Sequence, residues 1–259
     1  MKTRDAPSVV ETSPVSLVTH LEELRKRLWV CILAVLIFSI GGFFLAPRVL
    51  EWLKIPAGNT LPALAFFSPL EAMLATLKVA FAVGIFLSMP ILLYEVWVFV
   101  RPGLTPRERR FGLTFVVWGS LLFAGGAAFA YFGLLPVSLR FLLTFGGKML
   151  TPVISISEYL SFTLTVILAC GVVFELPLAV FFLTALGVIS PRLLKDKWRV
   201  AFLGIVAAAA VITPTQDVFS LLLMALPLLV LYGVSIVVSQ VALSGSKANN
   251  RMKDRKLQT

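Results

Sequence analysis

Long apolar runs separated by short polar segments make up most of this 259-residue chain. A helix needs about 20 apolar residues to cross a bilayer, and most of the runs approach or exceed that length. Because backbone polar groups in lipid must be satisfied within the segment, such runs form helices. The pattern therefore predicts an all-α, polytopic integral membrane protein with six transmembrane helices. The expected spans are 28–46, 72–100, 111–134, 158–186, 200–213 and 218–238.

The fifth run is too short for an ordinary span. Residues 200–212 rise roughly 20 Å at about 1.5 Å per residue, less than a hydrocarbon core of ~30 Å. A re-entrant hairpin and two spans across a locally thinned bilayer both fit this length. Basic segments on either side favour two crossings. We therefore expect a short fifth span, a short sixth span, and thinned or water-penetrated membrane around them.

Positive charge predicts the orientation. The chain has 23 Lys and Arg against 13 Asp and Glu, a net charge of +10. Most basic residues lie in the N-terminal lead, in loops 101–110 and 192–199, and in the tail. Basic residues concentrate in cytoplasmic loops, so six crossings place both termini in the cytoplasm. Anionic lipid headgroups explain this distribution better than nucleic acid does.

The remaining composition predicts one domain with two polar ends. Residues 1–16 are polar and contain Pro7 and Pro14, so they indicate a disordered cytosolic lead and no cleavable signal peptide. Residues 17–241 form one six-helix membrane domain, because no repeat or linker divides them. Residues 242–259 form a basic cytosolic tail. The two cysteines lie far apart in apolar runs, which argues against a disulfide.

Two acids lie in predicted cytosolic segments. Glu23 has Arg27 four residues later on a helical lead, a favourable pair that by itself indicates a salt-bridged surface helix. Glu108 is the sole acid among four basic residues in loop 101–110. It fits the first turn of the third span, where it would complement the helix dipole. It also fits an anionic acceptor for a guanidinium group, and the two interpretations have about equal weight.

A third acid lies inside the fourth span. Glu175 sits well within an apolar run, where an ionised group costs at least ~3 kcal/mol, so a functional role is favoured about two to one. Glu175 and Pro177 interrupt this span, because Pro177 leaves a backbone carbonyl beside the acid without its donor. The alternative is a neutral acid bonded to that carbonyl or to a threonine. The outside turn between the fifth and sixth spans holds Thr213 and Gln216. At its end, Asp217 fits an ordinary helix N-cap.

Several kinds of chemistry are disfavoured. His20 is the only histidine and lies outside the bilayer, which argues against a metal site and against an intramembrane Ser–His pair. No Walker A or dinucleotide-binding glycine pattern is present. We therefore expect no catalytic residue, no metal and no cofactor.

Short motifs in this order and spacing resemble the TatC family, the polytopic subunit of the twin-arginine protein translocase. The motifs are HLEELRKR (20–27), SPLE (68–71), YEVW (94–97), PGL (102–104), ERR (108–110), FELP (174–177), TP (213–214) with Asp217, and ALPL (225–228) with LY (231–232). One departure is Glu95, which stands where the family commonly has Gln. The resemblance extends from about residue 18 to 238.

The resemblance implies a non-enzymatic receptor in the bacterial inner membrane, with a concave, glove-like helical bundle. Such proteins bind twin-arginine signal peptides at the cytoplasmic face and assemble in several copies with single-span TatA/TatB-type subunits. They export folded proteins using the protonmotive force. The implied peptide-binding positions are Glu23, Glu108, Arg25, Phe99, Pro102 and Leu104. The implied intramembrane polar and partner-docking positions are Glu175, Pro177, Thr213, Gln216 and Asp217.

Two other functions fit the residues less well. A proton-coupled transporter of small solutes would use Glu175 as its proton carrier. Such transporters usually contain repeated halves with broken helices at matching positions, and the chain has no such repeat. An intramembrane hydrolase ranks third, because the apolar runs contain neither a histidine nor an aspartate pair.

Overall fold

The computed structural model describes residues 17–60, 64–103, 109, 112–144, 153–185, 187–212 and 218–257. Its secondary structure is helical, apart from one isolated bridge between Ala65 and Ser155. The elements are α1 (Leu17–Lys54), η1 (Ile55–Thr60), α2 (Pro69–Val100), η2 (Arg101–Gly103), α3 (Gly112–Phe129), η4 (Ala130–Leu134), α4 (Leu135–Thr144), α5 (Ile156–Phe174), α6 (Leu176–Ala185), α7 (Pro191–Asp196), α8 (Trp198–Ile212) and α9 (Val218–Leu257).

Six apolar helical runs cross the bundle, as predicted. Five are long and apolar enough to span a membrane: His20–Gly58, Pro69–Val100, Gly112–Thr144, Ile156–Thr184 and Val218–Gln240. The run that comes fifth in the chain, Trp198–Val211, is shorter, as expected. The sixth run differs from the prediction, because its 23 residues make it long enough to span. Helix α9 passes through Pro227 without ending and continues beyond the apolar residues.

Two helices extend further than the apolar pattern suggested. Helix α1 has 38 residues, because the polar lead continues directly into the apolar run and Pro47 does not end it. The third run continues through the π-helical turn η4 into α4, although the predicted span ended at residue 134. The π-turn lies just before Pro136, whose missing N–H disrupts regular helical bonding.

The fourth run is broken where the sequence suggested. Helix α5 ends at Phe174, Glu175 forms its C-cap, and α6 begins at Leu176. Pro177 cannot donate to the carbonyl of Val173 and disfavours helical backbone in the preceding residue. The N–H of Glu175 instead donates to the carbonyls of Val172 and Val173. This arrangement partly satisfies the backbone that Pro177 leaves open.

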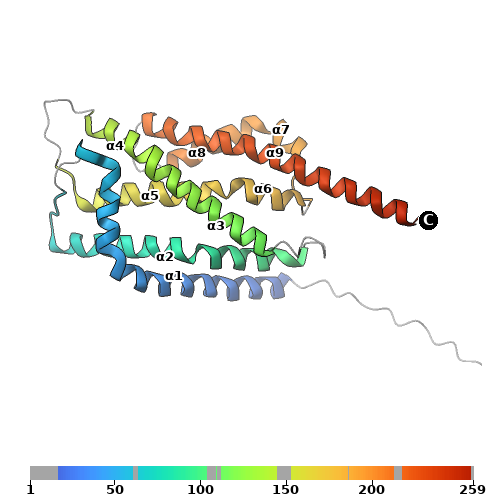
Figure 1. Ribbon diagram of the computed structural model, residues 1–259, viewed down its shortest axis with the longest axis horizontal. Helices are drawn as coiled ribbons and strands as arrows, with labels where there is room; N and C mark the ends of the chain where they lie inside the picture. The colour runs from blue at the N-terminus through green and yellow to red at the C-terminus, as the bar shows by residue number, and fades with distance from the viewer. Residues whose placement is uncertain are drawn as a thin grey trace, which may run out of the picture.

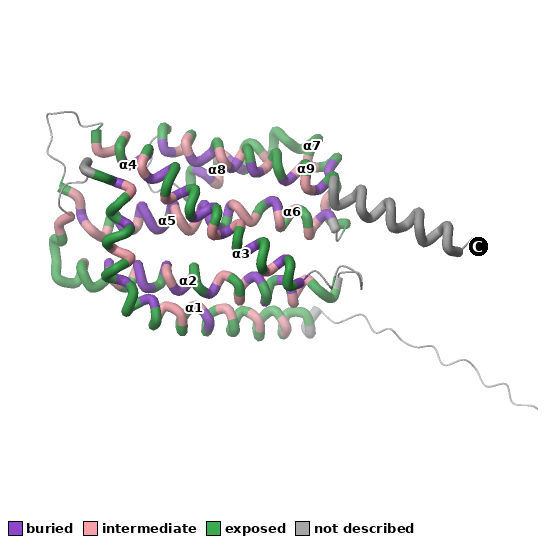
Figure 2. The backbone as a smooth tube through the Cα atoms, in the orientation of Figure 1, coloured by how far each residue is buried: buried purple, intermediate pink, exposed green. Residues whose placement is uncertain are grey.

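The helices pack side by side as a bundle (Figure 1). Helix α1 packs along α2, α3 along α5, and α6 along α9. The start of α1, the end of α2, α7 and the exit of α9 lie at the same end of the bundle (Figure 1). The described parts of all four basic segments therefore lie at or beyond this end of the bundle, which we call the basic end. Most of α1 is exposed, which fits a helix that faces lipid (Figure 2).

Polar side chains fasten the helices together at the opposite end. The hydroxyls of Tyr131 and Tyr159 donate to the carbonyls of Trp52 and Leu53, both over 2.7 Å, at the end of α1. These carbonyls belong to the last turn of the helix and have no partner within it. The two tyrosines therefore attach the end of α1 to the neighbouring helices.

Lys78 and Glu71, near the start of α2, find serine partners on another element rather than pairing with each other. Lys78 donates to the hydroxyls of Ser157 and Ser161, over 2.7 and 2.8 Å. Glu71 accepts from the hydroxyl of Ser155. These contacts join the start of α2 to the start of α5.

Substitutions at two adjacent glycines of α3, Gly125 and Gly126, can test how closely α3 packs against α5. A Cβ on Gly126 would lie 2.6 Å from the carbonyl oxygen of Cys170 and 2.8 Å from Cγ of Phe174. A Cβ on Gly125 would meet nothing within 4 Å. We expect Gly126→Ala to lower the free energy of unfolding by about 1–3 kcal/mol, because the helices must separate. Gly125→Ala is the matched control and should keep or slightly raise the thermal stability of the purified protein in detergent, because alanine favours the helix and its Cβ meets nothing. Equal stability of the two variants would contradict this account.

Candidate functional site

Two carboxylates converge on one guanidinium at the basic end. Arg27 of α1 donates from Nη2 to Oε1 of Glu23 on the same helix, over 2.8 Å. It also donates from Nη1 to Oε2 of Glu95 on α2, again over 2.8 Å. The three side chains form an ion triad across the α1–α2 interface.

The members of the ion triad differ in exposure. The side chain of Glu23 is 35 % exposed and that of Arg27 is 26 % exposed, whereas that of Glu95 is only 11 % exposed. Glu95 is therefore the inner partner and Glu23 the outer one. A half-exposed ion pair contributes little to stability, but removing the only partner of a buried charge is costly.

Aromatic rings also lie at the basic end, on α1 and α2. His20 of α1 stacks on Phe99 of α2 with ring centroids 4.4 Å apart and an interplanar angle of 22°. The guanidinium of Arg101 lies 5.5 Å from the ring centroid of Trp97, a cation–π distance. Trp97 is buried against Gly112 at the start of α3, where any Cβ would overlap its indole ring. Glycine at this position allows α3 to begin directly beside α2.

The structure places four of the six predicted peptide-binding residues at the basic end. Glu23 belongs to the ion triad, Phe99 stacks on His20, and Arg25 is exposed on α1. Pro102 lies in η2, and its carbonyl accepts from Nη2 of Arg109 over 3.4 Å. Leu104 and Glu108 lie outside the described residues.

Sequence reasoning left two members of the ion triad out of the site. Arg27 was recognised only as the partner of Glu23, and Glu95 only as a departure from a common glutamine. A signal was available, because Glu95 is the sole acid in the second half of an apolar span. The predicted pairing of Glu23 with Arg27 is confirmed.

A second polar position lies at the break between α5 and α6. The carboxyl group of Glu175 faces α3, since a Cβ on Gly119 would lie 3.2 Å from its Oε2. The same Cβ would lie 2.7 Å from Cδ1 of Leu93 and 3.1 Å from Cδ2 of Leu178. Among the described residues, Oε1 of Glu175 is buried and has no hydrogen-bond partner.

Of the predicted intramembrane partner-docking residues, the structure describes only Glu175 and Pro177. Pro177 is buried beside it in α6. The alternative in which a threonine binds the carboxyl group has no support in the described part of the chain, where Glu175 makes no side-chain hydrogen bond. Thr213, Gln216 and Asp217 fall outside the described residues.

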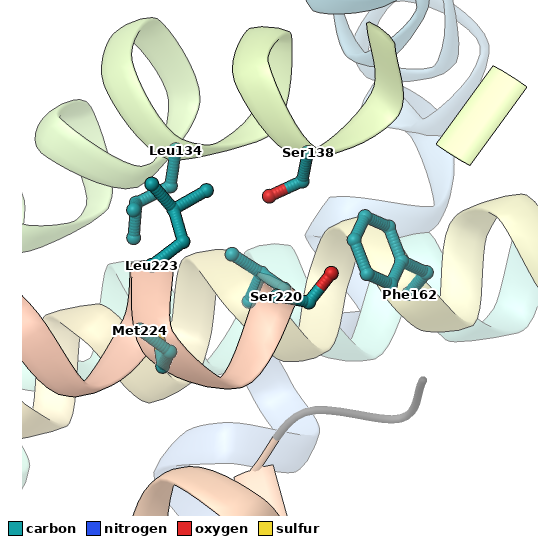
Figure 3. Close-up of a pocket in the computed structure, with 7 residues that line it drawn as sticks. Leu134, Ser138, Phe162, Ser220, Leu223 and Met224 are labelled. Atoms are coloured by element: carbon teal, nitrogen blue, oxygen red, sulfur yellow. The ribbon is translucent and has the colours of Figure 1, made fainter. Parts of the chain in front are cut away.

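A small cavity lies elsewhere in the bundle, between η4–α4, α5 and α9 (Figure 3). Its volume is about 10 Å³, which admits roughly one water molecule at most. The lining residues are Leu134, Ser138, Phe162, Val166, Ser220, Leu223 and Met224. This cavity is too small for an organic solute and includes no acid. Within the described residues, no three potential metal ligands cluster.

The arrangement at the basic end suits recognition of guanidinium groups. Carboxylates accept charge-assisted hydrogen bonds from the planar fork of arginine, and neighbouring aromatic rings favour the same cation. In the ion triad, two carboxylates share a single guanidinium, which leaves one negative charge without a counter-charge.

Comparison with known proteins gives a consistent family assignment. The family model described as Sec-independent protein translocase protein (TatC) matches residues 19–227. A "Sec-independent protein translocase protein TatC" of Carboxydothermus hydrogenoformans is 40 % identical over 231 residues, which cover 89 % of this chain and 95 % of that protein. The protein of the same name from Helicobacter pylori strain J99 is 40 % identical over 230 residues, covering 89 % and 91 %.

A crystal structure of a "Twin Arginine Translocase Receptor- TatC" has a similar fold. It superposes with a TM-score of 0.78 at 38 % sequence identity, covering 86 % of this chain and 99 % of that chain. The resemblance seen in the motifs is therefore confirmed along most of the sequence.

Proposed function

Because the chain belongs to the TatC family of Sec-independent protein translocase proteins, and so has a non-enzymatic role in protein translocation, we propose that it is the receptor for twin-arginine signal peptides. It binds them at the basic end, which faces the cytoplasm of a bacterium. The chain is a multi-pass membrane protein, and we place it in the inner membrane with both termini inside.

The ion triad is the observation that supports this proposal. Glu23 and Glu95 direct carboxylate oxygens at a guanidinium within a surface that is otherwise basic. A peptide with two adjacent arginines requires anionic, bidentate acceptors, and few carboxylates exist at this end. Glu108, which follows η2 in the sequence, supplies a further acceptor. Arg25, Phe99, Pro102 and Leu104 contact the rest of the signal peptide.

Glu175 serves the later steps in this proposal. Its buried oxygen without a partner, beside a helix break, is suited to bind a polar group on a single-span TatA/TatB-type subunit. Pro177, Thr213, Gln216 and Asp217 complete this docking region. Several copies of the chain assemble with such subunits and with membrane lipids, and the protonmotive force drives export of folded proteins.

The peptide-binding role predicts the effect of removing the acids. We expect Glu23→Ala and Glu108→Ala each to abolish crosslinking of a twin-arginine precursor, because each removes a guanidinium acceptor. The measurement is site-specific photo-crosslinking in membranes, with insertion verified by immunoblotting. Glu22→Ala is the matched control, since Glu22 is exposed on the same helix, and it should crosslink normally. Normal precursor binding by the double variant Glu23→Ala/Glu108→Ala would disprove the assignment.

The role of Glu175 predicts a separate defect. Glu175→Ala should reduce export of a folded reporter at least tenfold while precursor crosslinking stays within about twofold of wild type, because Glu175 is not one of the proposed guanidinium acceptors. Export assays and crosslinking in the same cells measure both quantities. Glu158→Gln changes an exposed acid at the other end of the α5–α6 run and serves as the control. Unchanged export by Glu175→Ala would reduce Glu175 to a structural residue.

A further inference from the structure

Arg27 occupies the place that an external guanidinium needs. Both of its terminal nitrogens are bonded to carboxylates, one on its own helix and one on α2. Its Nε is buried and has no hydrogen-bond partner within the described part of the chain. The guanidinium is therefore held by its two terminal nitrogens alone, and one of its two acceptors, Glu23, is a proposed peptide-binding residue.

The charges of the ion triad do not balance. Two carboxylates and one guanidinium leave one negative charge, which a second guanidinium would neutralise. The two carboxylates are not equivalent, because Glu95 is largely buried and Glu23 is partly exposed. An incoming guanidinium reaches Glu23 first, and the bond of Arg27 to Glu23 is the less costly one to break.

We propose that Arg27 is an internal ligand of the site, which an arginine of the incoming peptide displaces from Glu23. This inference rests on the proposed function. Before binding, Arg27 neutralises Glu23 and keeps other cations off it. After binding, Arg27 stays paired with Glu95, and the peptide arginine takes its place on Glu23. Each carboxylate then has its own guanidinium.

Glu95 is a positioning residue in this exchange. It does not touch the peptide, but it holds Arg27 and cancels the repulsion between Arg27 and the incoming arginine. An amide at this position would accept a hydrogen bond without providing the countercharge. The exchange therefore assigns a role to the negative charge of this largely buried acid.

Equilibrium binding of a fluorescent peptide with two consecutive arginines tests the exchange, using the purified full chain in detergent. Arg27→Gln should tighten binding roughly three- to tenfold, because the internal competitor is removed. Glu95→Gln should weaken binding by a similar factor, since Arg27 then depends on Glu23 alone. Arg27→Lys keeps the positive charge but loses the planar fork that reaches both carboxylates, so its effect should lie between wild type and Arg27→Gln.

Two further variants separate competition from changes in charge or folding. Lys26→Gln removes one positive charge from the exposed neighbour of Arg27 and should change binding by less than about twofold. Arg27→Gln/Glu95→Gln keeps the wild-type net charge and leaves no buried ion unpaired. It should bind the peptide at least as tightly as wild type. If Arg27→Gln alone fails to fold, this double variant tests whether Arg27 competes with the peptide.

The outcomes distinguish this inference from the proposed function. Weakened or unchanged binding by Arg27→Gln, or weakened binding by the double variant, overturns the exchange while binding remains dependent on Glu23. Binding that is unaffected by Glu23→Gln overturns both the exchange and the receptor assignment. Tightening by Lys26→Gln equal to that by Arg27→Gln would also overturn the exchange, because general charge would then explain the effect.

Discussion

A polar side chain inside an apolar bundle must find its partner within the protein, and this requirement organises the structure. At the end opposite the basic end, Lys78 and Glu71 are satisfied by serines of the α5 N-terminus, and two tyrosines bind the last carbonyls of α1. At the basic end, Glu95 is satisfied by Arg27. Polar contacts thus fix both ends of the α1–α2 pair, while the middle of α1 presents apolar residues outward. Glu175 is the exception among the acids, because one buried oxygen has no partner in the described residues.

The ion triad and Glu175 therefore differ in the chemistry that each can support. The ion triad contains more acceptors than its single guanidinium neutralises, so it is suited to exchange one cation for another. Glu175 has an oxygen with no bond to exchange, so it is suited to gain a partner rather than to swap one. Helix α2 contributes to both positions, since Leu93 reaches the contact between Gly119 and Glu175, and Glu95 reaches Arg27 two residues later. The geometries of the two positions are therefore linked through one helix.

The sequence predicted the helical class, the number of apolar crossings and the break at Glu175, because these follow from local apolar length, charge placement and the chemistry of proline. It did not predict that α1 continues to Lys54 or that the third run continues to Thr144, since helices continue into polar residues wherever nothing breaks them. Nor did it place Glu95 in the site. The pairing with Arg27 joins residues 68 positions apart and depends on how α1 packs along α2, which the apolar pattern does not determine. Glu23 was accessible to sequence reasoning only through its motif, because its local pairing with Arg27 looks like that of any surface helix.

The burial of Glu95 explains why a pair that is exposed at one end can still be specific. A carboxylate on the surface would accept lysine, arginine or a dissolved cation with little preference. Glu95 instead holds its guanidinium at 2.8 Å from inside the α1–α2 interface, and Glu23 shares that guanidinium at the same distance from outside. A cation that competes for Glu23 must therefore match the hydrogen bond that Arg27 already makes there, and not merely its charge. The planar fork of a second arginine makes equivalent N–H···O bonds, whereas a lysine ammonium acts as a compact, strongly hydrated point charge. The affinity of Arg27 for Glu23 thus sets the minimum affinity that an external cation needs in order to replace it there.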